Sequence, residues 1–356
     1  VKEQQNITNN SSGSILPASS IDKNGNINVA WLDDSPGIFS IFFTRSTDGG
    51  NSFSSPVMLP RNESFIGQPI VLSNETAIYI VHLEVFDTPK FIIRTNILRS
   101  TDSGKSFSLV NILEDEDLFV VSESAQIDAD GTIHIAASTL NPTDPQKPTF
   151  ANFDMRSTDG GKTFTANKIF ESASPLSSPI LIIEGDGKNT RSIFVDFSRQ
   201  NGGLFITNST DGGLTYTQPT LVTEKINDLV FATLFPTNNT THFIINRGSF
   251  DDEEFQLFYT KSGPDGRFAS EQPISNSNIQ TISSASLSAD DIGNLVIAFE
   301  GSAKKLSDMD YASRIFYLSS TDAGTNFSAL KSFEPVGGDD FGPVVLQDLR
   351  NNFSIL

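Results

Sequence analysis

The sequence predicts an all-β chain that folds as a β-propeller of four-stranded antiparallel blades. An octapeptide of the form Ser-x-Asp-x-Gly-x-x-aromatic recurs along the 356 residues, and its closing aromatic residues stand at positions 53, 107, 164, 216, 268 and 327. The steps between them, 52 to 59 residues, fit one supersecondary unit per repeat. Apolar and β-branched runs bounded by turn residues surround each copy, and no segment shows a convincing 3.6-residue period.

Each repeat contains the same four predicted strands. The third strand precedes the octapeptide, as in Phe39 to Thr44, and the fourth begins at its aromatic residue, as at Phe53. An earlier hairpin supplies the first two strands, and its second arm is a run of β-branched and aromatic residues bounded by turn residues, as in Asn28 to Trp31. Five copies of the octapeptide are good, and the copy at Ser262 to Phe268 is degraded.

A seventh repeat begins but is not completed. Gly342 to Gln347 and Phe353 to Leu356 predict two further strands, so the propeller has six blades plus a partial seventh and is six- or seven-bladed. We expect a polar N-terminal arm, residues 1–13, and a single propeller domain, residues 14–356. The arm could pair with the partial blade of its own chain or with that of a neighbour, since unpaired strand edges recruit strands. Self-association through the incomplete blade is therefore one expectation.

The residues of the octapeptide are typical of a tight hairpin turn. Its glycine can adopt the positive φ that a tight turn requires, and its aspartate can accept backbone N–H groups of the same turn. We therefore predict a structural and non-catalytic role for the box aspartates Asp48, Asp102, Asp159, Asp211, Asp265 and Asp322.

This octapeptide resembles the Asp box, or BNR repeat, of the sialidase superfamily, at the spacing of propeller blades. The resemblance implies a propeller with each box between the third and fourth strands. Sialidases also carry an Arg-Ile-Pro motif on the first strand, whose arginine helps to bind the substrate carboxylate, together with an aspartate acid/base and a Tyr–Glu nucleophile pair. Here the matching segment is Ile15-Leu16-Pro17, and an apolar Ile15 cannot bind a carboxylate. The resemblance therefore favours a non-catalytic member, and no catalytic residue is assigned.

Acidic residues gather in the loops predicted on the face that holds the pocket in sialidases. The candidates for cation binding are Asp33, Asp34, Asp115, Asp117, Asp251, Asp252, Asp339 and Asp340. Clustered carboxylates suit Ca²⁺, attract basic partners, or simply keep a surface solvated. No cofactor is otherwise expected, and a bound metal remains unknown. The net charge of −19 argues against nucleic-acid partners.

Composition points to an exported protein without a membrane span. The chain has no cysteine, and no apolar run approaches the roughly 18 residues of a spanning helix. Candidate N-glycosylation sites are Asn6, Asn62, Asn74, Asn208, Asn239, Asn326 and Asn352. We expect a secreted or cell-surface glycoprotein that binds a surface protein or a glycan in adhesion, recognition or assembly. The alternative is an exo-sialidase-type glycoside hydrolase with a displaced active site.

Overall fold

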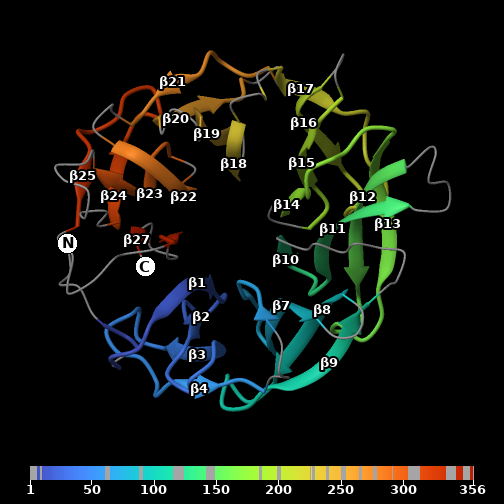
Figure 1. Cartoon of the computed structure of the whole chain (residues 1–356), viewed down its shortest axis with the longest axis vertical. Coiled ribbons are helices and arrows are strands. Elements are labelled where there is room, and N and C mark those ends of the chain that lie inside the picture. Colours follow the sequence, from blue (N-terminus) through green and yellow to red (C-terminus); the bar gives the residue numbers. More distant parts are fainter. Residues whose placement is uncertain are drawn as a thin grey trace. The chain divides into compact units, whose positions relative to one another are not determined.

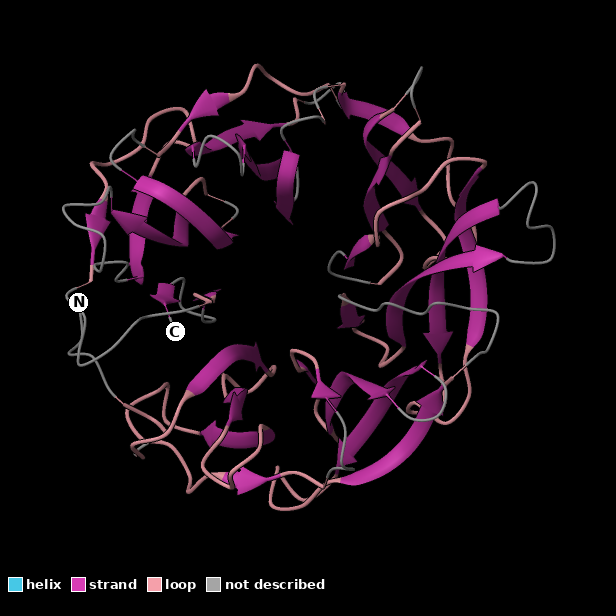
Figure 2. Cartoon of the chain, in the orientation of Figure 1, coloured by secondary structure: helices cyan, strands magenta, loops and turns pink. Residues whose placement is uncertain are grey.

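The computed structural model describes most of the chain. The described residues are 6–8, 10–60, 65–87, 91–114, 124–141, 149–183, 187–198, 202–224, 226, 229–237, 240–249, 254–263, 267–275, 279–290, 292–303, 313–333, 342–347 and 353–355. They form strands, turns and loops, and no helix occurs among them (Figure 2). The described part of the chain thus contains no helix long and apolar enough to cross a membrane.

The chain divides into two compact units, Val1–Leu221 and Val222–Leu356. The first unit contains four antiparallel sheets that follow one another in chain order (Figure 1). Their strands are β1 (Ser14–Ile21), β2 (Ile27–Asp33), β3 (Ser40–Ser46) and β4 (Val57–Met58); β5 (Phe65–Ile66), β6 (Ile70–Ser73), β7 (Ile78–Asp87), β8 (Phe91–Ser100) and β9 (Ser108–Leu113); β10 (Ala125–Ile127), β11 (Ile133–Asn141), β12 (Thr149–Ser157) and β13 (Thr165–Ser172); and β14 (Ile180–Ile183), β15 (Thr190–Asp196), β16 (Gly203–Ser209) and β17 (Thr220–Thr223). In the second sheet β5 and β6 both pair with β7, as two parts of one first strand.

The second unit contains two four-stranded sheets and one two-stranded sheet. Their strands are β18 (Leu229–Pro236), β19 (Thr241–Ser249), β20 (Glu254–Lys261) and β21 (Gln272–Pro273); β22 (Ile279–Ala289), β23 (Leu295–Ala303), β24 (Ser313–Ser320) and β25 (Lys331–Ser332); and β26 (Val345–Gln347) and β27 (Phe353–Ile355). The prediction of six antiparallel propeller blades and a partial seventh is confirmed. The division into an arm, residues 1–13, and one domain, residues 14–356, stays a prediction.

The fourth strand of the first blade starts later than predicted. The sequence analysis places its start at Phe53, whereas β4 begins at Val57. Ser54 N still donates to Arg45 O at 2.9 Å, but Pro56 has no N–H with which to extend the ladder. Pro219 stands at the same position before β17. Proline therefore shortens the outer strand in both blades.

The octapeptide is called a box from here on, and the second, third, fourth and sixth boxes pack against the third strand of the preceding blade. In the first unit, Gly104 of the second box lies over the Phe43 ring on β3, and Gly161 of the third box lies against Ile97 on β8. Phe107 of the second box meets Phe43 edge-on, with 5.0 Å between ring centroids. The largest apolar clusters of this unit accordingly lie between neighbouring blades.

The first strands of neighbouring blades run side by side in the same direction. Leu181 N of β14 donates to Ser124 Oγ beside β10, and Ile183 N donates to Gln126 Oε1 two residues further along both strands. The loops between second and third strands therefore emerge together, and we call this side of the unit the loop edge. The boxes lie on the opposite side, the box edge.

Candidate functional site

The boxes at the box edge share one hydrogen-bond pattern. In the third box, Ser157 Oγ accepts a hydrogen bond from Gly161 N at 2.9 Å and donates one to Asp159 Oδ1 at 2.9 Å. Asp159 Oδ1 also accepts the backbone N–H of Thr163, and Oδ2 accepts its hydroxyl. The bonds from serine to aspartate, from glycine to serine and from backbone to aspartate recur around Asp48, Asp102, Asp211 and Asp322. Asp265 lies outside the described residues.

These bonds hold the box carboxylates in the ionised form. Hydrogen bonds from Ser106 lower the pKa of Asp102 to about 2, and those from Thr215 lower the pKa of Asp211 to about 2. Hydrogen bonds from Asn326 lower the pKa of Asp322 to about 2 in the same way. The acceptor capacity of each carboxylate is used within its own turn. This geometry fits the structural role predicted for the boxes.

Ser157→Ala should destabilise the protein by about 1–3 kcal/mol, because the buried N–H of Gly161 loses its acceptor. Urea unfolding followed by circular dichroism measures the change in unfolding free energy. Ser106→Ala is the matched control, since this exposed hydroxyl donates to an exposed carboxylate. Equal losses in the two variants would contradict the role assigned to the buried serine.

Three buried carboxylates occupy one position near the loop edge of the first unit. Asp33, Glu84 and Asp196 each lie six residues after the second-strand residue that pairs with the box serine (27 to 33, 78 to 84 and 190 to 196). Each of the three residues is at most 8% exposed. The repeat thus places an acid at the same level in three of the four blades of this unit.

Asp33 is held by donors of its own blade and of the preceding segment. Its Oδ2 accepts hydrogen bonds from Asn10 Nδ2, Ser14 Oγ and Trp31 Nε1, and its Oδ1 accepts the N–H of Ser35. Burial alone would raise the pKa of Asp33, but these hydrogen bonds outweigh it and hold the pKa well below its usual range. A carboxylate with four donors has little capacity left for a cation.

The cation prediction rests on residues that are mostly outside the described ranges. Asp34 Oδ1 accepts the N–H of Gly13 at 2.8 Å. Within the described ranges, no group of three or more His, Asp or Glu is arranged to hold a metal ion. The remaining candidates, which lie outside those ranges, are Asp115, Asp117, Asp251, Asp252, Asp339 and Asp340. Calcium binding by them stays a prediction.

Asp196 is a loop-edge acid that the sequence analysis overlooked. Its Oδ1 accepts the N–H of Ser198 at 2.9 Å, as Asp33 Oδ1 accepts that of Ser35 at 2.9 Å. Its Oδ2 accepts the Ser172 hydroxyl at 3.2 Å. The available signal is an Asp-x-Ser tripeptide that starts at the last residue of the second strand in both blades. A search for clustered acids passes over it, because a single aspartate stands there.

Exposed phenylalanines mark the same edge of the first unit. Phe197 directly follows Asp196 and is 50% exposed, Phe39 precedes β3 and is 40% exposed, and Phe65 pairs with Val85 near the end of β7 and is 72% exposed. Exposed apolar side chains mark a contact surface where they gather on one side of a protein. By contrast Trp31 is buried beside Phe42, as its strand position predicts.

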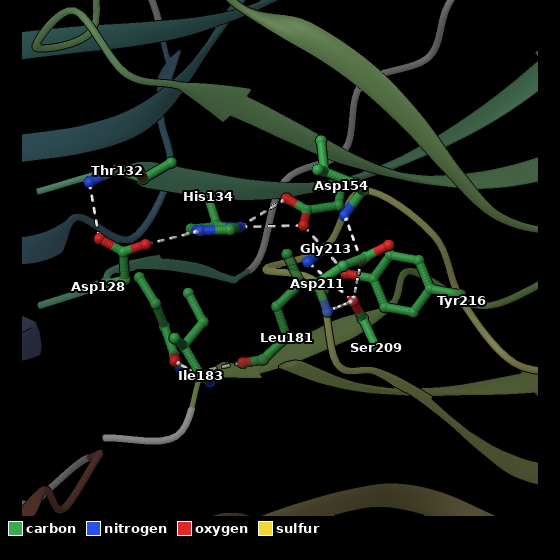
Figure 3. Close-up of polar contacts among 12 residues, drawn as sticks. Asp128, Thr132, His134, Asp154, Leu181, Ile183, Ser209, Asp211, Gly213 and Tyr216 are labelled. Carbon is green, nitrogen blue, oxygen red and sulfur yellow. Dashed lines mark hydrogen bonds and ion pairs between the residues drawn. The ribbon is translucent and has the colours of Figure 1, made fainter. Parts of the chain in front are cut away.

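A buried polar cluster joins the third blade to the fourth (Figure 3). His134 on β11 contacts Asp154 on β12 through Nδ1, at 2.9 Å from Oδ2 and 3.1 Å from Oδ1. Its Nε2 faces Asp128 Oδ2 at 3.7 Å. The hydroxyl of Tyr216, from the fourth box, donates to Asp154 Oδ2 at 2.9 Å. In the sequence Tyr216 stands out only as the closing aromatic of its octapeptide, and the cluster emerges only from the fold.

The first strand places Ile15 among apolar neighbours. Ile15 pairs with Leu32 on β2 and packs, partly buried, against the cluster shared by the first two blades. Several arginines are committed elsewhere: Arg45 to Asp22 at 2.7 Å, and Arg94 to Glu114. In the second unit Arg247 binds Glu271 with two hydrogen bonds, of 2.7 and 2.8 Å.

The candidate glycosylation sites differ in what their side chains do. Asn326 Nδ2, the atom a glycan would occupy, donates to Asp322 Oδ2 at 2.7 Å inside the sixth box. Asn74 and Asn6 use Oδ1 to accept hydrogen bonds from Thr76 and Thr8, two residues ahead. Asn208 lies on β16. Asn62, Asn239 and Asn352 lie outside the described residues, and glycosylation stays a prediction.

Several solved structures share the fold of this chain. An ulvan lyase, a polysaccharide lyase, matches 94% of this chain and 87% of its own at 12% identity and a TM-score of 0.62. An α-L-arabinofuranosidase from Fusarium graminearum matches 95% of this chain and 85% of its own at 14% identity and a TM-score of 0.51. A sialidase from Trypanosoma rangeli matches 86% of this chain at 14% identity and a TM-score of 0.53. The chain has the sialidase-like β-propeller fold.

The resemblance noted from the Asp boxes is therefore confirmed at the level of fold. The sialidase-like chain spans 55% of the length of the Trypanosoma rangeli enzyme. No protein-family model matches the sequence, and no curated protein matches it.

Proposed function

We propose that this sialidase-like propeller is a secreted or cell-surface protein that recognises a glycan at the loop edge of its first unit. The observation that carries the proposal is that three exposed rings, Phe39, Phe65 and Phe197, belong to the edge that also holds the buried carboxylates. The fold adds support, because the solved structures that share it include a sialidase, an arabinofuranosidase and a polysaccharide lyase.

Sugar rings present an apolar C–H face and a rim of hydroxyl groups. A phenylalanine ring that is already exposed can cover the apolar face without unfolding the core. Hydroxyl groups donate to carboxylates and to main-chain carbonyls, which the loops beside Asp34 and Asp196 provide. Rings and acids on one edge therefore suit a neutral or hydroxyl-rich glycan better than an anionic one.

We further propose that the protein does not hydrolyse sialosides. Ile15 stands where the resemblance places the first carboxylate-binding arginine, and its side chain packs against the core. Arg45, Arg94 and Arg247 already bind carboxylates of this chain. A sialoside would lose the bidentate contacts that fix its carboxylate in this kind of site.

Phe197→Ala should weaken glycan binding at least about tenfold without changing the fold, because it removes an exposed ring rather than a core residue. A glycan array identifies the ligand, and calorimetry on the best glycan gives the dissociation constant. Leu214→Ala is the matched control: Leu214 is 54% exposed but lies in the fourth box, at the box edge. Equal weakening in both variants would contradict recognition at the loop edge.

A sialoside release assay separates recognition from the hydrolase alternative. No turnover is expected with the native protein. Turnover that disappears in Asp196→Asn, while binding to the array persists, would identify a displaced hydrolase site and overturn the non-catalytic proposal.

A further inference from the structure

The contact between the third and fourth blades differs chemically from the two box contacts before it. The residue three positions before the box serine meets the glycine of the next box, and it is Phe43 on β3 and Ile97 on β8. On β12 the same position holds Asp154, whose carboxylate lies against Gly213 of the fourth box. The aromatic residue of that box is also different, since Tyr216 replaces phenylalanine.

The polar residues at this contact form one connected chain. Tyr216 donates its hydroxyl to Asp154, Asp154 contacts Nδ1 of His134, and Nε2 of His134 faces Asp128 (Figure 3). His134 and Asp154 are fully buried, and Asp128 sits in the turn between β10 and β11. Buried charges are retained only when they are paired and hydrogen-bonded. The arrangement of these side chains therefore limits which of their atoms carry protons.

The donors and acceptors around His134 restrict where the protons of the cluster lie. Burial and the charge of Asp154 raise the pKa of Tyr216 far above its usual value, so this hydroxyl keeps its proton and donates it to a carboxylate. Asp128 Oδ1 accepts the N–H groups of Asp130 and Thr132, so its Oδ2 is the oxygen that faces His134. Nδ1 of His134 must then donate to Asp154. A bare Nε2 would turn its lone pair towards Asp128, whereas a protonated Nε2 turns an N–H towards it.

Two other charged groups face the cluster. Arg156 pairs with His134 across β11 and β12, and Asp211 belongs to the fourth box. Both act on Tyr216, with opposite signs. The positive charge of Arg156 and the negative charge of Asp211 balance each other. The carboxylates of Asp128 and Asp154 beside His134 are therefore left without a compensating positive charge, unless His134 supplies it.

We propose that His134 is a buried imidazolium that fastens the fourth blade to the third. Asp154 bridges this cation to Tyr216, and Asp128 Oδ2 faces its other ring nitrogen at 3.7 Å, an ion pair without a hydrogen bond. The fourth box is thereby attached through charge, where the second and third boxes attach through apolar packing. Of these three contacts, the one between the third and fourth blades is the one that a change in charge can loosen, and we name it the charged latch.

Nitrogen-15 NMR of the three histidines at neutral pH tests the latch directly. His82 and His242, which are buried with lowered pKa values, serve as internal references for the neutral ring. We expect both ring nitrogens of His134 to carry protons in the native protein. A single ring proton on His134 would overturn the proposal, whatever the variants do.

Two variants test what the latch does. Tyr216→Phe restores the residue of the other boxes and removes one hydrogen bond to a charged group, so amide exchange in β16 and β17 should accelerate about 10- to 100-fold. Asp154→Asn keeps the shape and removes a charge, and His134 should then lose one ring proton. Unchanged exchange in Tyr216→Phe would show that the hydroxyl does not fasten the blade, and His134 still doubly protonated in Asp154→Asn would show that Asp154 does not hold the charge.

Discussion

Gly104→Ala should destabilise the protein by about 3 kcal/mol or more. A Cβ at this position would lie 2.9 Å from Cζ of Phe43 and closer still to Cε1, well inside van der Waals contact. Phe43 is fully buried between β3 and the second blade, so its ring has no room to retreat. The glycine also has a φ of +84°, which an alanine adopts with strain. Overpacking and backbone strain add together here.

Gly49→Ala separates these two causes. Gly49 has a φ of +69° in the first box, but a Cβ there would meet no atom within 4 Å. The control should lose only about 1 kcal/mol, from the backbone conformation alone. Urea unfolding of both variants gives the comparison. Similar losses in the two would show that the box glycine is required for its φ and that its packing against the preceding blade contributes nothing.

Much of the fold could be predicted because the repeat encodes it locally. The octapeptide specifies a turn through Ser157, Asp159 and Gly161, and one such turn per repeat sets the number and order of the strands. The lengths of the outer strands were harder to predict, because Pro56 and Pro219 interrupt ladders that the pattern of apolar residues would extend. The split of the first strand into β5 and β6 was missed in the same way.

The loop edge could be predicted only in part. Asp33 was found as an acid, but its contacts with Asn10 and Trp31 join residues whose proximity depends on the fold. Asp196 and Phe197 carried a weak signal, an Asp-x-Ser tripeptide that starts at the last residue of the second strand. Exposure separates Phe197 from the many buried phenylalanines, and no spacing in the sequence reports it.

The charged latch could not be predicted from the sequence at all. His134, Asp154 and Tyr216 come from three elements of two blades. Taken alone, each of them looks like an ordinary strand or box residue of its repeat. Aligning the repeats by their box serines reveals the exception, since Asp154 stands where Phe43 and Ile97 stand in the preceding blades. That comparison gains its meaning once the structure shows that this position meets the next box.

The protein should lose stability as the pH falls from about 6.5 towards 4, with His242 as a principal cause. His242 lies at the position in β19 that His134 has in β11, but its neighbours are Tyr259 and Lys261 rather than carboxylates. Burial, with a smaller contribution from the charge of Lys261, lowers the pKa of His242 to about 4. Nδ1 of His242 lies 2.6 Å from the Tyr259 hydroxyl, and that hydroxyl also donates to Ala323 O at 3.4 Å.

The sign of the effect follows from the protons bound by each state. Between about pH 6.5 and pH 4 the unfolded chain binds a proton at this histidine and the folded chain does not, so unfolding takes up a proton and is favoured by acid. The contribution of His242 is complete above about pH 6.5, and about 3 kcal/mol of it is lost by pH 4. The box aspartates Asp102, Asp211 and Asp322 act at lower pH. Their pKa values are near 2 in the folded protein, so the stability that they contribute is lost only as the pH falls below the ordinary pKa of aspartate.

His242→Asn tests the assignment, because an asparagine amide can still form a hydrogen bond with the Tyr259 hydroxyl but does not titrate. Unfolding free energies from urea titrations at about pH 7, 5.5 and 4 should fall steeply in the native protein and much less in the variant. His82→Asn is the companion measurement, since burial also lowers the pKa of His82 and its loss should flatten the curve further. A native protein whose stability does not change between these pH values would show that His242 already binds a proton in the folded state. A variant as steep as the native protein would assign the acid sensitivity to other groups.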